Sequence, residues 1–479
     1  MTICDMSVTE LSKKLATGEL TSVSIVRAYR EAYEADKSSE KPLHGYIEFF
    51  ETAEQDAARA DEARATGDTR PLLGVPFASK DNISIKGKAC TCGSALLEGY
   101  VAPYNATVTE QLMAAGAIPL GRTNMDEFAM GSSTEYSSYG PSRNPVNRDL
   151  TPGGSSGGSA AVVAGGLAPI ALGTETGGSI RLPASYCGIY GLKPTYGSLS
   201  RSGVVAFGSS FDQVGLLARS VDDIGLMLSV MGGLDRLDDT STNTDFSALA
   251  NLKSADISRL KIAIPKEFME AKGLDPEVAA VFEQTCEWFR SRGATIETIS
   301  IPVLEAAIGC YYVIALAEGA SNLGRFDGIR YGNRRDPGTG YDDLYVKTRS
   351  EGCNAEVKRR IIIGNYILSN HFSGDTYKKA VSVRARIQRE VAAVFESFDI
   401  LLCPTSPTTA FPLGEKIDDP PAMYLSDLYT TFANLARIPS LSIPAGKSTQ
   451  GLPVGVQLCG PQGCEEKILE VARAWEEDK

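Results

Sequence analysis

The chain has 479 residues, of which 43% are hydrophobic, and its 47 basic and 59 acidic residues give a formal net charge of −12. This length allows one very large domain or two to three ordinary ones. The acidic charge makes the chain a poor candidate for binding nucleic-acid phosphates by itself. If RNA takes part in its function, another subunit should supply the cationic surface.

The ten cysteines are too sparse for a disulfide framework, and free thiols suit a reducing compartment. Cys90 and Cys92 are the only close pair, and a C-x-C pair without a second pair at metal-site spacing is weak evidence for a metal. The N-terminus shows no basic segment followed by an apolar one, and the weakly polar run 160–173 is too short to cross a bilayer. We therefore expect a cytoplasmic protein that holds no metal or organic cofactor of its own.

Residues 1–70 are predicted to be mainly helical. The sequence Ser-Val-Thr-Glu at 7–10 is a capping box ahead of an amphipathic stretch. Residues 51–66 are rich in Ala, Glu, Asp and Arg and predict a second helix, which Gly67 should end. This N-terminal portion differs in its pattern of apolar and polar residues from the rest of the chain.

From Pro71 onward, short apolar runs alternate with helical segments. This alternation predicts an α/β architecture with a mostly buried sheet. The candidate strands lie at 73–78, 117–120, 169–172, 260–264 and 399–405.

Two polar stretches separate these elements. Residues 232–260 are rich in Asp, Ser and Thr and predict a surface connection, and residues 333–354 predict a mobile loop. Neither is long enough to require a domain boundary. We therefore expect one large α/β domain over residues 1–479, with 1–70 as its helical N-terminal portion.

Only two histidines, His44 and His371, are present. His44 is typical of a loop or strand-edge residue, and His371 lies in a helical-looking region without a second ligand at metal spacing. Neither accompanies a Gly-x-Ser-x-Gly nucleophile elbow. If the chain performs acyl chemistry, a base other than histidine must be used, and lysine is the usual substitute.

One lysine and two glycine-flanked serines supply such a set. Lys80 follows an apolar run, Ser155 lies in Gly-Gly-Ser-Ser-Gly-Gly-Ser, and Ser179 follows Thr176, Gly177 and Gly178. Two glycines let a backbone turn tightly and direct several N–H groups toward one point, which suits an oxyanion hole. A helix should begin just after Ser179.

The proposed base needs a perturbed pKa. A lysine with its ordinary pKa of about 10.4 is protonated at neutral pH and accepts no proton. Burial disfavours the ammonium and lowers that pKa. In this scheme Ser155 passes the proton of Ser179 to neutral Lys80.

The same residues allow other interpretations. A Gly/Ser stretch is most often a flexible connector, but this one is flanked by regular elements instead of polar tails. A phosphate loop would need a lysine after the glycines, and the dinucleotide pattern G-x-G-x-x-G is not matched. A single lysine is usually a solvated surface residue, so Lys80 gains weight only from the two serines.

Three segments, 153–159, 176–184 and 188–195, together resemble the amidase signature family. The resemblance implies a single α/β/α domain around a large mixed β-sheet. It also implies that Ser179 is the acyl-forming nucleophile, Ser155 the bridging serine and Lys80 the base. Glu175 stands where this family usually has Asp, which preserves the carboxylate one methylene farther out.

Four further segments, 123–135, 325–332, 356–361 and 427–431, resemble the glutamine-hydrolysing subunits of tRNA-dependent amidotransferases. Such subunits release ammonia from glutamine, and a B subunit uses it with ATP and Mg to amidate Glu-tRNA(Gln), while a small C subunit holds the pair together. A free-standing amidase acting on small or aryl amides is the alternative. A scaffold subunit with a decayed site is disfavoured because all three catalytic positions are filled.

The narrower resemblance also implies a glutamine pocket. An arginine suits the α-carboxylate of glutamine, and an aspartate suits its α-ammonium. Without the resemblance, the charged run 358–360 would be interpreted as a solvated helix face. The implied substrate-binding residues are Met130, Gly131, Tyr311, Asp427 and one arginine of the Arg359-Arg360 pair, of which we favour Arg360.

Overall fold

The computed structural model describes residues 2–369 and 375–479, and these contain one 11-stranded sheet. In their order across the sheet, the strands are β1 (Tyr46–Phe49), β3 (Ile118–Thr123), β2 (Pro76–Lys80), β4 (Ile170–Glu175), β6 (Gln213–Ala218), β5 (Tyr190–Lys193), β10 (Ser440–Lys447), β11 (Pro453–Cys459), β9 (Ile400–Pro404), β7 (Lys261–Pro265) and β8 (Thr295–Ile299).

The sheet is mixed, as the family resemblance implies. β2 runs parallel to both β3 and β4, and β7 runs parallel to both β8 and β9. The strands between these two groups pair antiparallel, from β4 through β6, β5, β10 and β11 to β9. Most strands of this sheet are buried along their whole length, which is why they appear in the sequence as continuous apolar runs.

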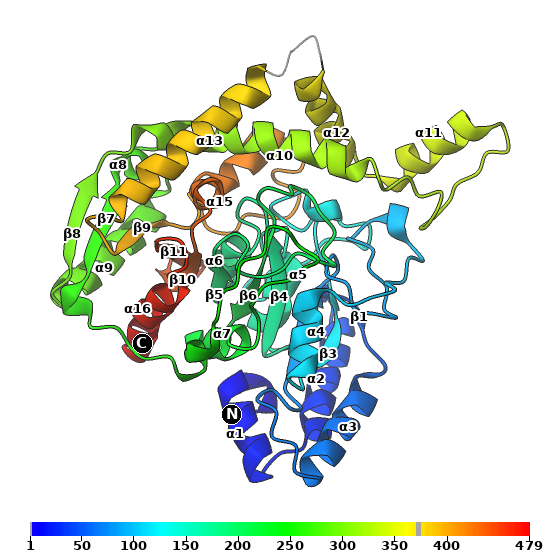
Figure 1. The fold of residues 1–479 in the computed structure, drawn as a ribbon, viewed down its shortest axis with the longest axis horizontal. Helices are drawn as coiled ribbons and strands as arrows, with labels where there is room; N and C mark the ends of the chain where they lie inside the picture. The colour runs from blue at the N-terminus through cyan, green and yellow to red at the C-terminus, as the bar shows by residue number, and fades with distance from the viewer. Residues whose placement is uncertain (1, 370–374) are drawn as a thin grey trace.

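Figure 1 shows how the helices surround the sheet. They are α1 (Val8–Thr17), α2 (Ser22–Lys37), α3 (Ala53–Ala65), α4 (Thr107–Ala114), α5 (Gly157–Ala164), α6 (Arg181–Cys187), α7 (Val221–Leu228), α8 (Lys266–Met269), α9 (Pro276–Ser291), α10 (Ala307–Leu323), α11 (Tyr341–Gly352), α12 (Ala355–Leu368), α13 (Asp375–Val394), α14 (Pro420–Tyr424), α15 (Thr431–Ala436) and α16 (Glu465–Glu477).

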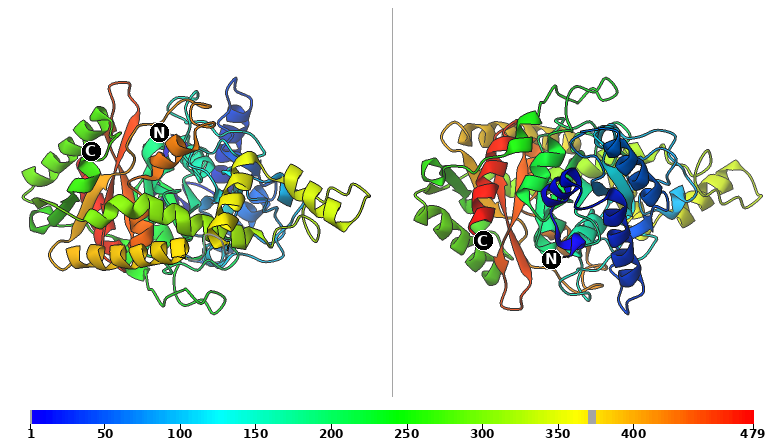
Figure 2. Two further views of the ribbon diagram at one scale, coloured as in Figure 1. Left: turned by 90° about the horizontal axis from the view of Figure 1, so that it is seen from above. Right: turned by 90° about the horizontal axis from the view of Figure 1, so that it is seen from below.

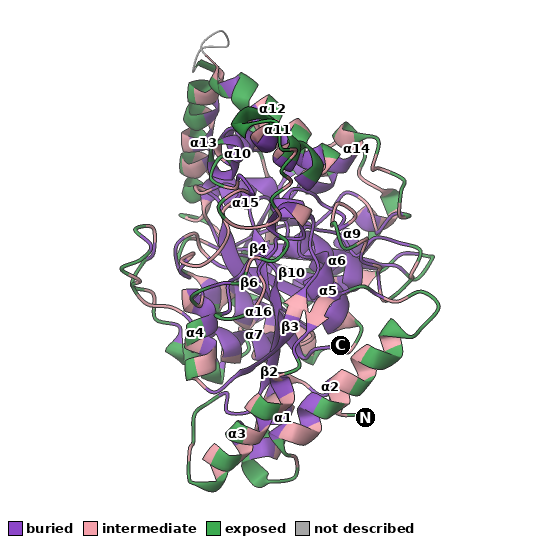
Figure 3. Ribbon diagram, turned by 90° about the vertical axis from the view of Figure 1, so that its right-hand side faces the viewer, coloured by how far each residue is buried: buried purple, intermediate pink, exposed green. Residues whose placement is uncertain are grey.

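Two short helices occupy the centre of the molecule. α5 packs on β2, β4 and β6, and α6 packs on β5, β10 and β11. Every residue of α6 is buried, and Figure 3 shows both helices within the buried interior. The loops that precede these two helices are therefore held by the core of the protein.

A separate group of helices covers one end of the sheet. α10 packs against α12, α13 and α15, and α10 and α13 lie side by side when the molecule is seen from above (Figure 2). The helices α1, α2 and α3 lie at the opposite end (Figure 1). The helices α10, α12, α13 and α15 and the two central helices together enclose the site described below.

The structure confirms most predicted elements. The capping box at Ser7 forms, with the Ser7 hydroxyl accepting the N–H of Glu10 and the Glu10 carboxylate accepting the N–H of Ser7. α3 falls within the predicted range 51–66, and the region 232–260 is a connection with two short 3-10 turns. The first predicted strand begins three residues later than 73 and continues to Lys80, because Gly74 has a φ of +84° and breaks the run.

Two expectations need correction. Residues 341–352, within the predicted loop 333–354, form α11, which has acidic residues in its first turn and Arg349 in its last, as the helix dipole favours. The mainly helical range 1–70 also contributes β1, which pairs with β3 at the sheet edge. Short strands of this kind carry little periodic signal in the sequence.

A longer apolar segment than 160–173 is present. Residues Pro302–Leu323 form a 22-residue helical stretch long and apolar enough to cross a membrane, but 67% of its 18-residue window is buried inside the protein. It is the core helix on which α12, α13 and α15 pack. Cys90 and Cys92 are buried free thiols, no metal-binding cluster occurs among the described residues, and His371 lies outside them.

The close strand packing predicts a stability difference between two glycines. A Cβ on Gly215 would lie 2.1 Å from the carbonyl oxygen of Leu192 on the neighbouring strand, whereas a Cβ on Gly309 would meet nothing within 4 Å. Gly215→Ala should therefore destabilise the protein by about 1–3 kcal/mol. Gly309→Ala, in α10, should be neutral or stabilise it by about 0.5 kcal/mol. Urea unfolding of both variants checks this, and equal effects would contradict the strand packing.

Candidate active site

Parallel pairing brings the predicted catalytic residues to one edge of the sheet. Lys80 is the last residue of β2, and Glu175 is the last residue of the adjacent parallel strand β4. Ser179 lies in the loop from β4 to α6, and Ser155 lies in the loop that leads into α5. Because the carboxyl ends of parallel neighbours meet at the same edge, residues far apart in the sequence converge there.

The Lys80 amine lies among hydroxyl and carbonyl oxygens. Its Nζ is 2.8 Å from Ser155 Oγ, 2.8 Å from Ser156 Oγ and 3.3 Å from the carbonyl oxygen of Thr174. The Ser156 hydroxyl also donates to that carbonyl, so Ser156 links the amine to β4. Lys80 forms no ion pair with any described residue.

The environment of Lys80 lowers its basicity. Burial penalises the ammonium and lowers the pKa of Lys80 to about 7, and the carboxylate of Asp126 opposes this shift. At that pKa, a large fraction of the amine is neutral near pH 7 and is able to accept a proton. The direction and cause of this shift are those expected from the sequence.

The Ser155 loop is built against Asp126. The Gly154–Ser155 peptide bond is cis, and a Cβ on Gly154 would lie 2.2 Å from Asp126 Oδ2. The Asp126 carboxylate accepts the N–H groups of Thr134 and Tyr136, and its own N–H donates to the Ser155 carbonyl at 3.3 Å. Only glycine fits at position 154, which explains one glycine of the serine motif.

The Ser179 loop presents free backbone donors. Among the residues that the structure describes, the N–H groups of Gly177, Gly178 and Ser179 have no hydrogen-bond acceptor. The Ser156 N–H donates to the Ser179 carbonyl at 3.1 Å, and this bond joins the two serine loops. The Thr176 hydroxyl donates to Asp212 at 2.6 Å, so it braces the loop from the other side. Unpaired N–H groups beside a serine are what an oxyanion hole requires.

Glu175 and Arg181 stabilise this loop by hydrogen bonds and an ion pair. One oxygen of Glu175 accepts the N–H groups of Ile180 and Arg181, and the other pairs with the Arg181 guanidinium. Burial alone would raise the pKa of Glu175, but Arg181 outweighs it and the pKa lies below its ordinary value. The glutamate thus accepts two backbone N–H groups at the start of α6 and pairs with the Arg181 side chain.

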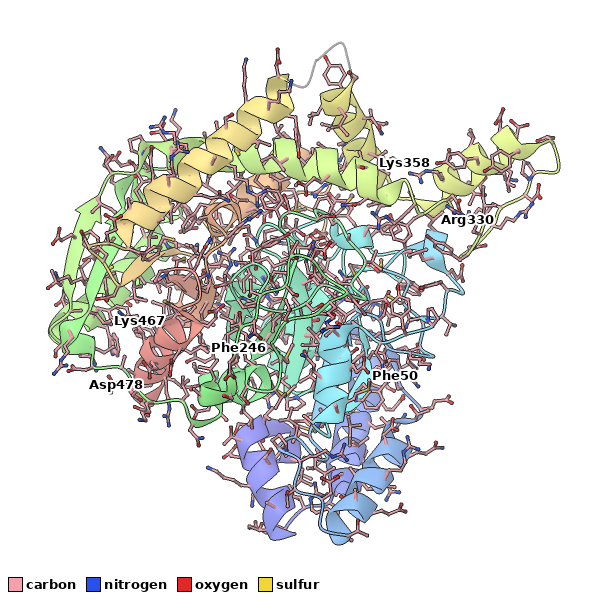
Figure 4. All side chains as sticks on the ribbon, in the orientation of Figure 1. Phe50, Phe246, Arg330, Lys358, Lys467 and Asp478 are labelled. Carbon is pink, nitrogen blue, oxygen red and sulfur yellow. The ribbon has the colours of Figure 1, made fainter. Side chains whose placement is uncertain are left out.

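The two candidate arginines differ in burial. The Arg360 side chain is 3% exposed, whereas that of Arg359 is 38% exposed. Arg360 Nε donates to Glu356 at 2.7 Å, and its Nη2 atom is buried with no hydrogen-bond partner. Arg360 therefore has a free donor in the protein interior. Lys358, the first residue of the charged run, is exposed near the start of α12, at the base of the projecting segment that carries Arg330 (Figure 4).

Asp427 supplies the opposite charge. Its carboxylate accepts the hydroxyl groups of Ser132 and Tyr312, each at 2.9 Å. Burial raises the pKa of Asp427 to about 7. A cationic ligand nearby would favour the carboxylate form of this residue.

The nucleophile loop borders Asp427 and Tyr311. A Cβ on Gly178 would lie 3.2 Å from Asp427 Oδ1, and a Cβ on Gly177 would lie 2.4 Å from Cζ of Tyr311. Tyr311 and Asp427, which the resemblance assigns to a glutamine pocket, therefore lie beside the Ser179 loop. The glycines leave room for these two side chains.

Met130 and Gly131 are placed less directly. A Cβ on Gly131 would meet the Asp126 carboxylate at 2.4 Å, and the Met130 methyl packs against Gly319 of α10. Their neighbour Ser132 contacts Asp427. Sequence reasoning did not assign roles to Ser132, Ser156, Tyr312 or Glu356; the only available signals were the place of Ser132 in the segment 123–135 and the i, i+4 spacing of Glu356 and Arg360.

This sheet, with a lysine–serine cluster at the carboxyl ends of two parallel strands, defines an amide-hydrolysing enzyme of α/β/α architecture. Residues 24–469 match the family model described as amidase. The chain belongs to the amidase family.

The curated and solved relatives narrow this further. The chain is 60% identical to the A subunit of a glutamyl-tRNA(Gln) amidotransferase from Treponema denticola, over 99% of both chains. It resembles the crystal structure of the corresponding A subunit from Thermotoga maritima with a TM-score of 0.80 and 35% identity, covering 100% of this chain and 96% of that one. The peptide amidase from Stenotrophomonas maltophilia matches with a TM-score of 0.84 and 29% identity, over 99% and 96% of the two chains.

The lysine environment predicts a pH dependence of nucleophile reactivity. Labelling of Ser179 by a sulfonyl fluoride should accelerate as the pH rises through about 7, because Lys80 becomes neutral. Lys80→Met should slow labelling by roughly 10²–10⁴-fold and remove the pH dependence. The rate of covalent labelling, with the site located by peptide mass spectrometry, checks this.

Lys193 is a matched control, because it is also buried but, within the described part of the chain, its amine donates a hydrogen bond only to the carbonyl of Pro194. Lys193→Met should retain the pH dependence of labelling. Labelling of wild-type protein at Ser155 or at a cysteine, or a rate independent of pH, would contradict the assigned roles.

Proposed function

We propose that this chain is the glutamine-hydrolysing subunit of a tRNA-dependent amidotransferase, which releases ammonia for amidation of Glu-tRNA(Gln) on a partner protein. The observation that carries this proposal is the unpaired Nη2 of Arg360 together with the Asp427 carboxylate. The two side chains both contact Tyr312, and Asp427 lies beside Gly178 of the Ser179 loop. A free amino acid carries one charge for each of these groups. The names of the relatives that share 60% and 35% of the sequence support the same function.

The proposed reaction proceeds by acyl transfer. Ser179 Oγ attacks the side-chain amide carbon of glutamine, and its proton passes through Ser155 to neutral Lys80. The N–H groups of Gly177 and Gly178 stabilise the oxyanion. The proton then returns to the leaving nitrogen, ammonia departs, and a glutamyl ester remains on Ser179. Water hydrolyses this ester by the same route and releases glutamate.

The two charged groups give specificity. Arg360 would bind the α-carboxylate and Asp427 the α-ammonium, so the side-chain amide extends toward Ser179. A plain amide leaves the Nη2 donor of Arg360 without an acceptor and the Asp427 carboxylate without a cation, which is costly in a dry site. An independent amidase acting on small or aryl amides has no need of this pair, and that is the main argument against the alternative.

The other steps of the overall reaction require partners. The chain is acidic, and its sequence contains no phosphate loop of the Walker type. We therefore assign ATP, Mg and aminoacyl-tRNA binding to a B subunit, with a C subunit joining the two chains. The protein would act in the cytoplasm, where the tRNA is found.

Glutamine kinetics test the proposed pocket. Arg360→Met and Asp427→Asn should each raise the KM for glutamine by at least about 30-fold, equivalent to about 2 kcal/mol, because a desolvated charge loses its partner. Since burial raises the pKa of Asp427 to about 7, the carboxylate is lost as the pH falls through that value, and the KM of the wild type should rise below pH 7. The Asp427→Asn variant should lack this rise.

Ser179→Ala is the control that separates binding from chemistry. It should abolish ammonia release while isothermal titration still detects glutamine. Normal glutamine hydrolysis by both pocket variants would place the amino-acid site elsewhere and would favour the independent amidase.

A second experiment tests the partnership. The isolated chain should bind neither ATP nor tRNA at physiological salt, and its glutaminase rate should rise when B and C subunits, ATP and Glu-tRNA(Gln) are added, because ammonia made without an acceptor wastes glutamine. Ammonia release is measured with tRNA binding followed in parallel. Full activity alone, unchanged by partners, would indicate an independent amidase.

A further inference from the structure

Glu356 is a buried carboxylate that the reaction scheme above does not use. It lies in the first turn of α12, one helical turn before Arg360, and its side chain is 1% exposed. Its Oε1 accepts Arg360 Nε at 2.7 Å and the Tyr424 hydroxyl at 2.8 Å, while Oε2 pairs with Arg359. Both oxygens of Glu356 are therefore engaged, and one of them fixes the guanidinium of Arg360.

The remaining surroundings of Arg360 are aromatic. The centre of its guanidinium lies 5.1 Å from the ring of Tyr424, 5.8 Å from that of Tyr312 and 5.9 Å from that of Phe207. Rings attract the cation through their faces, but they do not fix its rotation about the side-chain axis. The contact of Nε with Glu356 does so, because a hydrogen bond to a planar guanidinium sets the plane and the direction of its other donors.

We propose that Glu356 is a positioning residue that orients Arg360, so that the free Nη2 donor meets the α-carboxylate of glutamine. In this role Glu356 determines selectivity for a free amino acid over an amide that lacks the carboxylate. The inference rests on the proposed glutamine-hydrolysing function and specifies which residue orients the guanidinium of Arg360.

The start of α12 is held independently of Glu356. The Asn354 side chain caps the helix by accepting the N–H of Val357 at 2.9 Å, and the Asn354 N–H donates to Glu127 at 2.7 Å. Farther along the helix, a Cβ on Gly364 would lie 2.0 Å from the carbonyl oxygen of Leu316, so α12 sits directly on α10. Loss of the Glu356 charge should therefore leave the helix in place while it weakens the contacts of Glu356 with Arg360, Arg359 and Tyr424.

The test compares two substrates that differ only in the group Arg360 would bind. 4-Aminobutanamide is glutamine without its α-carboxylate. Glu356→Gln should raise the KM for glutamine by about 10–100-fold, by analogy with the loss of a hydrogen-bond partner of a metal-binding side chain. The kcat should change by less than about threefold, and kcat/KM for 4-aminobutanamide should remain within about threefold of wild type.

Glu390→Gln provides the matched control, because Glu390 pairs with Arg386 at i, i+4 spacing on the exposed side of α13. It should leave both substrates unaffected. Tyr424→Phe removes one hydrogen bond to Glu356 but keeps the ring over Arg360, so it should raise the KM for glutamine by a smaller factor. This milder variant serves if Glu356→Gln fails to fold.

A double-mutant cycle distinguishes orientation from a general structural role. In an Arg360→Met background, Glu356→Gln should raise the KM for glutamine by less than about threefold, because the two residues act through one contact. Additive effects, or equal losses with both substrates, would overturn the proposal. If the wild-type protein hydrolysed 4-aminobutanamide but not glutamine, the proposed function itself would be overturned. If the wild-type protein hydrolysed glutamine but Glu356→Gln left the KM for glutamine unchanged, only the role of Glu356 would be overturned.

Discussion

The burial of one lysine without a carboxylate partner is the constraint around which this site is organised. Lys80 ends a fully buried strand, and among residues 2–369 and 375–479 its amine forms hydrogen bonds only with hydroxyl and carbonyl oxygens. Such surroundings satisfy a neutral amine and tolerate an ammonium poorly. Burial destabilises the charged form of Lys80 and so makes the lysine a base near neutral pH. No histidine among the described residues is placed to serve instead.

Hydrogen bonds hold the neighbours of Lys80 in place, and these neighbours determine its pKa. The Ser156 hydroxyl links the Lys80 amine to β4, and the Ser156 N–H joins the Ser155 loop to the Ser179 carbonyl, so hydrogen bonds connect the lysine with both serine loops. Asp126 supports the Ser155 loop and also keeps the pKa of Lys80 from falling farther. The fold thus uses one carboxylate for both geometry and electrostatics.

Recognition and chemistry share a single buried framework. The Arg181 guanidinium pairs with Glu175 below the nucleophile loop and donates to the carbonyl of Thr430 and the side chain of Asn434, near Asp427. The Thr430 hydroxyl in turn donates to the carbonyl of Gly177 at 2.6 Å. The position of the carboxylate assigned to the substrate ammonium is therefore coupled to the position of the predicted oxyanion hole.

Several features follow from the sequence alone. Continuous apolar runs identified the buried parallel strands, because a sheet covered on both faces shows no alternation. The scarcity of histidine and the spacing of Lys80, Ser155 and Ser179 indicated a lysine-dependent serine mechanism. The glycines around the serines indicated close backbone approach, and the contacts of Gly154, Gly177 and Gly178 supply the reason for each.

Other features depended on contacts between distant segments. Whether Arg359 or Arg360 faces the interior is a matter of helix rotation, and it is decided where α12 packs on α10. The roles of Ser132 and Tyr312 arise only because their chain segments meet at Asp427, 295 and 115 residues away. The sequence by itself determined which reactive groups are present and what local backbone they require. The tertiary structure decided which of those groups share a dry environment, because burial and pairing are properties of the whole fold.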